Sequence, residues 1–278
     1  MTKGVCLFCQ QYRTLTGEHT FSDWINRLYP AMRGYTFTQT SPDGDTQQWK
    51  SKYINQKLRL PCEECNNGWM SSVESAARDI LKDMVNYRGG SISIPVERIA
   101  ALAAFTFLKA VVLDHAPMVA KDKSPFFAPS IREKFLHTRE LPNGVYMWLA
   151  ACHSRQAAHT GLLRTVYHKQ RMLGFKDFIF TLAFGWVVLQ LVAFRPVRHS
   201  RTPLTFPRPH EGAEWRGSTI EFWPLCDCGP LAWPPRKLLS DGTLTQFACR
   251  WNRATCNVLP RLSRPIFAPH WSTPQTVR

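Results

Sequence analysis

The sequence predicts an α+β fold made of a small cysteine-paired N-terminal unit and a larger unit of helix and antiparallel sheet. Three observations support this prediction. There are two Cys-x-x-Cys motifs in the first 65 residues, a long run with helical apolar spacing, and several short runs rich in β-branched and aromatic residues. We expect the units to span residues 1–88 and 89–260, followed by a disordered tail at 261–278.

The chain is strongly basic. Lys and Arg outnumber Asp and Glu by 35 to 20, which gives a formal net charge of +15 over 278 residues. Such a charge attracts polyanions, so nucleic acid is the first partner to consider and a membrane surface the second, although many basic proteins are merely soluble. The N-terminus lacks the apolar stretch and cleavage site of a secretory signal, so we expect a cytosolic (cytoplasmic) protein.

A helix is expected just after the second cysteine pair. The run ESAARDILKDMV, Glu74 to Val85, has apolar residues at helical spacing. Asn66 and Asn67 then lie near the N-terminus of this helix. Trp69 and Met70 are expected to anchor the helix by packing, with base stacking as the less favoured alternative.

The second unit is expected to combine a buried helix with an antiparallel sheet. The run VERIAALAAFTFLKAVVLDH, residues 96–115, is apolar on most of its circumference, as in a buried helix. Strand-like runs occupy residues 145–152, 162–168 and 178–194. The last run approaches the roughly 18 apolar residues of a membrane span. Its Gln190, central Gly185 and high content of Phe, Val and Trp favour two short buried strands or one bent strand.

The C-terminal part is expected to close this sheet. The runs IEFWPL and TLTQFACRW are typical of strands, with a turn at Asp241 and Gly242 between them. The segment 195–216, rich in Pro and Arg, is expected to form an exposed loop that either touches phosphate or is simply solvated.

The two Cys-x-x-Cys pairs predict a structural zinc site. Cys6 and Cys9 form the first pair, and Cys62 and Cys65 form the second. Two thiolates from each pair can complete a tetrahedron around Zn²⁺. A redox dithiol would need a strand and helix of thioredoxin type, for which the first ten residues leave too little chain. Zinc binding can supply on the order of 10 kcal/mol to the folding of a segment with few aliphatic residues.

Four further cysteines lie near the C-terminus, at positions 226, 228, 249 and 256. They could form another metal site, but the Cys-x-Cys spacing is not that of a standard zinc knuckle. Buried free thiols are the favoured interpretation.

Glu18 and His19 are adjacent in the stretch LTGEHTFSDW between the two cysteine pairs. Neighbouring residues on a strand point to opposite faces, yet at a strand end or bend both can reach one ion and one water. Taken alone, the pair favours the simpler interpretation of a solvated carboxylate beside a surface or half-buried imidazole.

Together, the motifs CLFC, EHTFSDW and CEECNNGWMSSVE resemble the HNH endonuclease superfamily in its zinc-stapled form. The resemblance covers roughly residues 4–85. The combination of motifs is similar to that of a group of bacterial and phage HNH-like proteins with a longer C-terminal domain. It implies a treble-clef, or ββα-metal, fold for the N-terminal unit.

The resemblance also implies roles for individual residues. It assigns Glu18 to a catalytic divalent ion and His19 to the general base. Asn66, with Asn67 beside it, takes the place of the polar residue that completes the family's metal site, where His is common, and Asn55 would be the central Asn of the motif. Mg²⁺ or Mn²⁺ prefers oxygen ligands, which Glu18 and an Asn amide can provide.

Two functions follow from these expectations. The first is a metal-dependent endonuclease that hydrolyses DNA phosphodiester bonds, with an imidazole base activating water and one divalent ion stabilising the leaving group. The second is a non-catalytic zinc module that binds nucleic acid or a protein. The C-terminal unit offers no motif that indicates chemistry.

Overall fold

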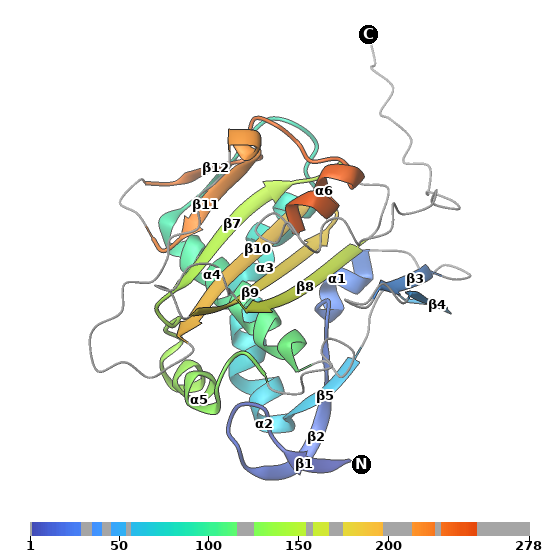
Figure 1. Ribbon diagram of the computed structural model, residues 1–278, viewed down its shortest axis with the longest axis vertical. Helices are drawn as coiled ribbons and strands as arrows, with labels where there is room; N and C mark the ends of the chain where they lie inside the picture. Colours follow the sequence, from blue (N-terminus) through green and yellow to red (C-terminus); the bar gives the residue numbers. More distant parts are fainter. Residues whose placement is uncertain are drawn as a thin grey trace.

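The computed structural model describes residues 2–28, 35–40, 46–53, 57–115, 125–153, 158–166, 175–196, 213–225 and 229–248 (Figure 1). Within these ranges the chain has a mixed α+β fold with antiparallel sheets, which confirms the predicted fold class. Asn55, residues 197–212 of the segment rich in Pro and Arg, the four C-terminal cysteines and the tail at 261–278 lie outside the described residues.

A three-stranded antiparallel sheet with the order β1-β2-β5 forms the N-terminal end of the molecule. Its strands are β1 (Lys3–Val5), β2 (Tyr12–His19) and β5 (Lys57–Cys62). Between β2 and β5 the chain forms α1 (Asp23–Leu28) and a hairpin of β3 (Tyr35–Thr40) and β4 (Thr46–Ser51). This excursion takes up much of the sequence that separates the two cysteine pairs.

A helical segment follows β5 directly. It consists of α2 (Glu63–Cys65), η1 (Asn66–Met70) and α3 (Ser71–Val85). The segment is kinked at Gly68, whose φ and ψ of −88° and −110° are not helical. The helix predicted from residue 74 is confirmed, because α3 buries residues at helical spacing: Val73, Ala77, Ile80, Leu81 and Met84.

The centre of the molecule is a five-stranded antiparallel sheet with the order β11-β7-β10-β9-β8. Its strands are β7 (Val145–Ala151), β8 (Ala158–Val166), β9 (Phe175–Phe184), β10 (Val187–Pro196) and β11 (Thr219–Trp223). The apolar run 178–194 is therefore a hairpin that turns at Gly185, where φ is +56°. Within the described residues, no helix is long and apolar enough to cross a membrane.

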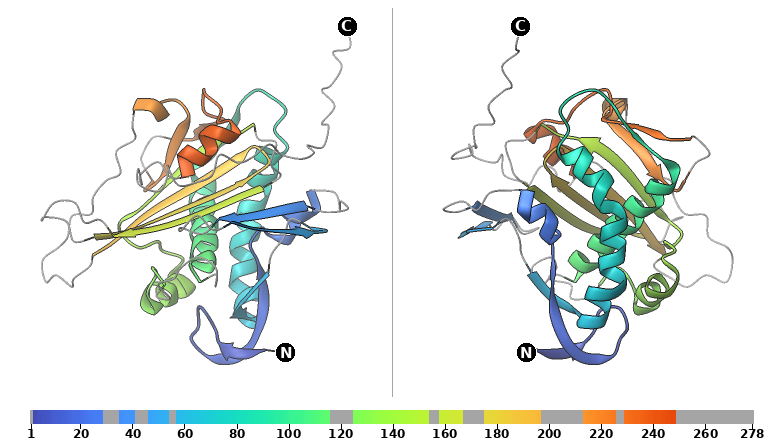
Figure 2. Two further views of the ribbon diagram at one scale, coloured as in Figure 1. Left: turned by 45° about the vertical axis from the view of Figure 1, so that its right-hand side comes forward. Right: turned by 180° about the vertical axis from the view of Figure 1, so that it is seen from behind.

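Helices cover both faces of this sheet, which explains why β10 has no polar face (Figure 2). Val187, Leu189 and Leu191 belong to the main core with α3 and α4. Val188 and Val192 point to the other face and pack in a second cluster with Phe247 of α6 (Asp241–Ala248). A strand buried on both faces has a continuous apolar sequence rather than an alternating one.

The predicted buried helix is α4 (Val96–Asp114), which packs against α3 and against strands β10 and β11 of the sheet. The remaining elements are β6 (Ile92–Ile94), α5 (Pro129–Thr138), η2 (Ala213–Trp215) and β12 (Leu231–Trp233), with β12 paired to β6. The main core runs without interruption from Cys6 to Trp233. The predicted boundary at residue 88 therefore crosses a shared core, and the division into units 1–88 and 89–260 stays a prediction.

One predicted strand is wrong. The run that begins at Asp241 forms helix α6 instead of a turn and a strand. Ser240 and Thr243 cap its start reciprocally: the Ser240 N–H donates to Thr243 Oγ1 over 2.6 Å, and the Thr243 N–H donates to Ser240 Oγ over 3.3 Å. Leu244 and Phe247, three residues apart, then share the buried face of the helix.

Candidate metal centre and active site

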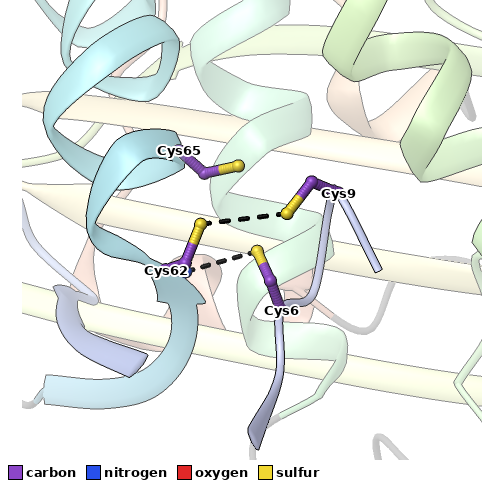
Figure 3. A group of neighbouring side chains, drawn as sticks. All are labelled: Cys6, Cys9, Cys62 and Cys65. Atoms are coloured by element: carbon purple, nitrogen blue, oxygen red, sulfur yellow. Dashed lines mark hydrogen bonds between the residues drawn. The ribbon is translucent and has the colours of Figure 1, made fainter. Parts of the chain in front are cut away.

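The four cysteines of the two pairs meet in one cluster (Figure 3). Cys6 and Cys9 lie on the connection between β1 and β2, Cys62 ends β5, and Cys65 ends α2. Their Sγ atoms all lie within 4.8 Å of one another, and Cys9 and Cys62 are 3.8 Å apart. A tetrahedron with Zn–S bonds of about 2.3 Å has edges of about 3.8 Å, so these thiols can hold a metal ion such as zinc.

Backbone contacts fix the first cysteine pair against the second. The N–H of Leu7 donates to the carbonyl of Leu60 over 2.9 Å, and the N–H of Cys62 donates to Cys6 Sγ over 3.2 Å. Gln10 closes the turn with a left-handed φ of 58° and donates its side-chain amide to the Leu7 carbonyl over 2.8 Å. These hydrogen bonds set the path of the connection around the cysteine cluster.

Burial acts to raise the pKa of Cys6, but hydrogen bonds from backbone N–H groups lower it overall. Burial makes the two thiols of the second pair poor acids on their own. It raises the pKa of Cys65 to about 11, and it raises the pKa of Cys62 as well. A metal ion binds the thiolate form, so loading of this cluster releases protons and favours neutral to alkaline pH.

Helix α5 and Trp69 pack against the cysteine cluster. Trp69 makes edge-to-face contacts with Phe8 at 4.8 Å and Phe135 at 5.7 Å between ring centroids. The guanidinium of Arg139 lies 4.3 Å from the centre of the Trp69 ring, and Arg132 donates to the carbonyl of Leu7. These contacts confirm the packing role predicted for Trp69, and Met70 is likewise buried.

Glu18 and His19 are the last two residues of strand β2, and their side chains point to opposite faces of the sheet. Glu18 is opposite Leu58 and His19 is opposite Lys57 in the pairing with β5. Glu18 is buried, whereas His19 is half-buried. The solvated carboxylate expected from the sequence alone is therefore wrong, and the half-buried imidazole is confirmed.

Lys109 of α4 joins Glu18 to the helical segment. Its Nζ lies 2.5 Å from Glu18 Oε1 and 2.5 Å from Glu74 Oε1, and it donates to the backbone carbonyl of His19 over 2.9 Å. Ser22 donates to Glu74 Oε1 over 2.6 Å. The Lys109 side chain is fully buried, and those of Glu18 and Glu74 are 6% and 18% exposed.

Charge at this ion pair is not balanced, because two carboxylates share one ammonium. Burial raises the pKa of Glu18 and outweighs the attraction of Lys109. Burial also acts to raise the pKa of Glu74, but Lys109 and the Ser22 hydroxyl lower it overall. The two carboxylates raise the pKa of Lys109 despite its burial. With all three groups ionised the cluster carries one net negative charge.

The surroundings of His19 favour the neutral form of its imidazole. Burial lowers its pKa, and the nearby ammonium of Lys57 lowers it further. A neutral imidazole at physiological pH is able to accept a proton.

Lys109 and Glu74 are not among the site residues predicted from the sequence. Lys109 is the one charged side chain in the middle of an apolar helix, and a lysine in such a place is almost always paired with a carboxylate. That signal predicts a partner without saying which one. Glu74 adjoins the buried face of α3, one position from Val73 and three from Ala77.

Asn66 and Asn67 are not brought into this ion pair. Asn66 donates its amide Nδ2 to Thr16 Oγ1 over 3.0 Å, and Asn67 is exposed. Among the residues that the structure describes, the four cysteines are the one group of three or more Cys, His, Asp or Glu side chains placed to hold an ion. A catalytic ion site at Glu18, Asn66 and Asn67 thus stays a prediction.

No protein-family model, curated protein or solved structure matches the chain. The resemblance to HNH endonucleases therefore rests on the motifs and their spacing.

Proposed function

We propose that the chain is a zinc-stapled endonuclease of the HNH type that hydrolyses phosphodiester bonds in DNA. The main support is the order of elements around the cysteine cluster. Strand β2 ends in Glu18 and His19, β5 pairs with β2, and the following helix α3 carries Glu74 to the ion pair of Glu18. This succession of strand, strand and helix is what a treble-clef ββα-metal unit requires. The net charge of +15 suits a polyanionic substrate.

Zinc in the four-cysteine cluster has a structural role in this proposal. Four thiolates fill the tetrahedral shell and leave no position for substrate. The ion ties the β1–β2 connection to the start of the helical segment, and so holds the end of β2 against α3.

His19 serves as the general base. Its lowered pKa keeps the imidazole neutral near pH 7, and its half-buried position leaves one side open to a water and a phosphate. Lys109 and Glu74 hold the backbone at His19 through the carbonyl hydrogen bond and the ion pair, so the imidazole is carried by a rigid strand end.

The acidic cluster suits a divalent ion in charge and in donor type. When Glu18 and Glu74 are both ionised, two carboxylates share the one ammonium of Lys109, and Mg²⁺ and Mn²⁺ prefer carboxylate and amide oxygens. Glu18 would hold the ion, together with Glu74 or with the amide oxygen of Asn66, whose nitrogen is the atom bonded to Thr16. Bound at the end of β2, where Glu74 and His19 act on each other electrostatically, such an ion would neutralise charge on a phosphate beside His19 and on the leaving oxygen.

Nicking of supercoiled plasmid with Mg²⁺ or Mn²⁺ tests the proposal. His19→Ala should lower the cleavage rate by about 100-fold or more, since general bases typically contribute that much. Zinc content and DNA affinity should stay at the wild-type level. His137→Ala is a matched control, because this histidine is exposed on α5 and takes no part in the site. Equal activity of His19→Ala and wild type would refute the assignment.

A non-catalytic, zinc-containing module that binds nucleic acid or protein is the second candidate, and Lys109 favours it. The ammonium already neutralises Glu18, the carboxylate that the nuclease needs for its ion. If highly purified protein binds DNA but cleaves neither supercoiled, linear nor single-stranded forms with either metal, this second function replaces the first.

A further inference from the structure

The strand register places His19 on a face of the N-terminal sheet that carries cations. His19 is opposite Lys57 and Gly17 is opposite Arg59. Cross-strand partners share a face, and residues two apart on a strand do too, so these four residues lie on one side. Glu18 is opposite Leu58 on the reverse side, where it meets Lys109. We call these four residues the His19 face.

The two cations of the His19 face are available to a ligand. Lys57 and Arg59 are both exposed. Within the described part of the chain, neither forms an ion pair with a carboxylate, although Arg59 donates to the hydroxyl of Thr2 over 3.0 Å. Arg13 of the same sheet differs, because it is paired with Glu64.

Because Gly17 has no side chain, the Lys57 side chain can lie directly over the strand at this point. A Cβ at this position would lie 3.2 Å from Cδ and 3.3 Å from Cβ of Lys57, tighter than an ordinary contact. The aliphatic part of Lys57 therefore lies over the glycine. The nearness of its ammonium to His19 agrees with the lowered pKa of that imidazole.

The other end of the sheet is less suited to an anion. Tyr12 is 71% exposed and Lys3 is exposed beside it, but the hollow that they line also contains Glu63 and Glu64. At the His19 end, by contrast, Lys57 and Arg59 form no ion pair within the described residues, while Asp23 and Glu74 act on the His19 imidazole.

We propose that the His19 face is the surface on which a nucleic acid backbone lies, with Lys57 and Arg59 each contacting a phosphate beside the His19 imidazole. The inference deepens the proposed function and rests on it for the identity of the ligand. The substrate would lie on this face of the sheet, positioned by Lys57 and Arg59.

The test is binding of a labelled DNA duplex, measured by fluorescence anisotropy over a range of salt without Mg²⁺ or Mn²⁺. The Lys57→Gln/Arg59→Gln variant should bind on the order of tenfold more weakly near 0.1 M salt, and its slope of log K against log salt should be shallower by about 1.8, because two phosphate contacts are lost. Circular dichroism and zinc content verify that the variant is folded.

The Arg236→Gln/Lys237→Gln variant is the matched control. It removes the same charge from exposed residues that follow β12, at the opposite end of the molecule from β5 (Figure 1). It should keep the wild-type salt slope. An unchanged slope in the Lys57/Arg59 variant, or an equal loss in the control, would overturn the proposal.

The two proposals fail in different ways. If the wild-type protein binds DNA through Lys57 and Arg59 but never cleaves it, the nuclease assignment is wrong and the proposed binding surface is supported. If the wild-type protein cleaves DNA and the Lys57→Gln/Arg59→Gln variant binds and cleaves it equally well, the proposed binding surface is wrong and the nuclease assignment is supported.

Discussion

Lys109 illustrates how one residue joins the two parts of the sequence. Its ammonium is fully buried and is stabilised by Glu18, Glu74 and the carbonyl of His19. The arrangement is favourable only while all partners are present, because an unpaired buried charge is costly.

Lys109→Met should therefore destabilise the protein strongly. It leaves two carboxylates facing each other without a cation, and breaking a buried pair from one side typically costs about 3–5 kcal/mol. Urea unfolding provides the measurement. Lys134→Met is the control, since its exposed ion pair with Glu140 at 2.8 Å should contribute less than about 1 kcal/mol. A similar small loss for both variants would contradict the role given to Lys109.

The imidazole of His19 should titrate below its ordinary range. Its pKa is lowered by burial and by Lys57, so Lys57→Gln should move the pKa upward by removing a cation that opposes protonation. NMR of the imidazole protons in protein without added divalent ion measures this directly. A pKa that stays fixed or falls in the variant would mean that Lys57 does not act on His19.

Among the elements, the β1–β2 connection and α2 are expected to depend on a bound metal ion. Their four thiols converge within 4.8 Å, although 52 residues lie between Cys9 and Cys62. Neither element is long, so we expect metal binding to add to the stability that packing against Trp69 and α5 provides.

Zinc removal should loosen this end of the molecule first. Elemental analysis is expected to find at least one Zn²⁺ per chain, and a strong chelator or Cys62→Ser should speed amide hydrogen exchange in β1 and β2 before the central sheet. Cys152→Ser is the control, because this buried thiol lies outside the cluster. Retention of exchange protection in β1 and β2 after metal removal would exclude the structural role.

The elements also differ in how far their sequences predicted them. α4 and the β9–β10 hairpin are long and uniformly apolar, so their local pattern suffices. The run TLTQFACRW predicts a strand, but the Thr, Leu and Phe residues that α6 contains suit either state. The reciprocal cap of Ser240 and Thr243 and the burial of Phe247 decide for helix.

At the scale of the whole molecule, the N-terminal part is built into the core of the C-terminal part. The main core is continuous, and α5 contacts the cysteine cluster through Arg132 and Phe135. A role for the C-terminal part follows: it supplies Lys109 and the surfaces that hold the cysteine cluster in place.

A fragment of residues 1–88 should consequently fail to fold cooperatively even with zinc. It would expose the α3 residues that pack against α4, and it would leave Glu18 and Glu74 without Lys109. Thermal unfolding and NMR dispersion, compared with the full chain, measure this. A sharp transition and a dispersed spectrum would instead establish the fragment as an autonomous domain.

By itself the sequence determined the cysteine cluster, the buried helix, the central strands and the pair of Glu18 and His19, because each depends on residue types at short, fixed spacings. Only the tertiary structure decided that Glu18 faces Lys109, that Glu74 shares the same ammonium and that His19 shares a face with Lys57 and Arg59. These partners are separated by up to 91 positions in the chain, and no local spacing encodes which distant side chain completes a buried charge. Strand register and helix packing make that choice.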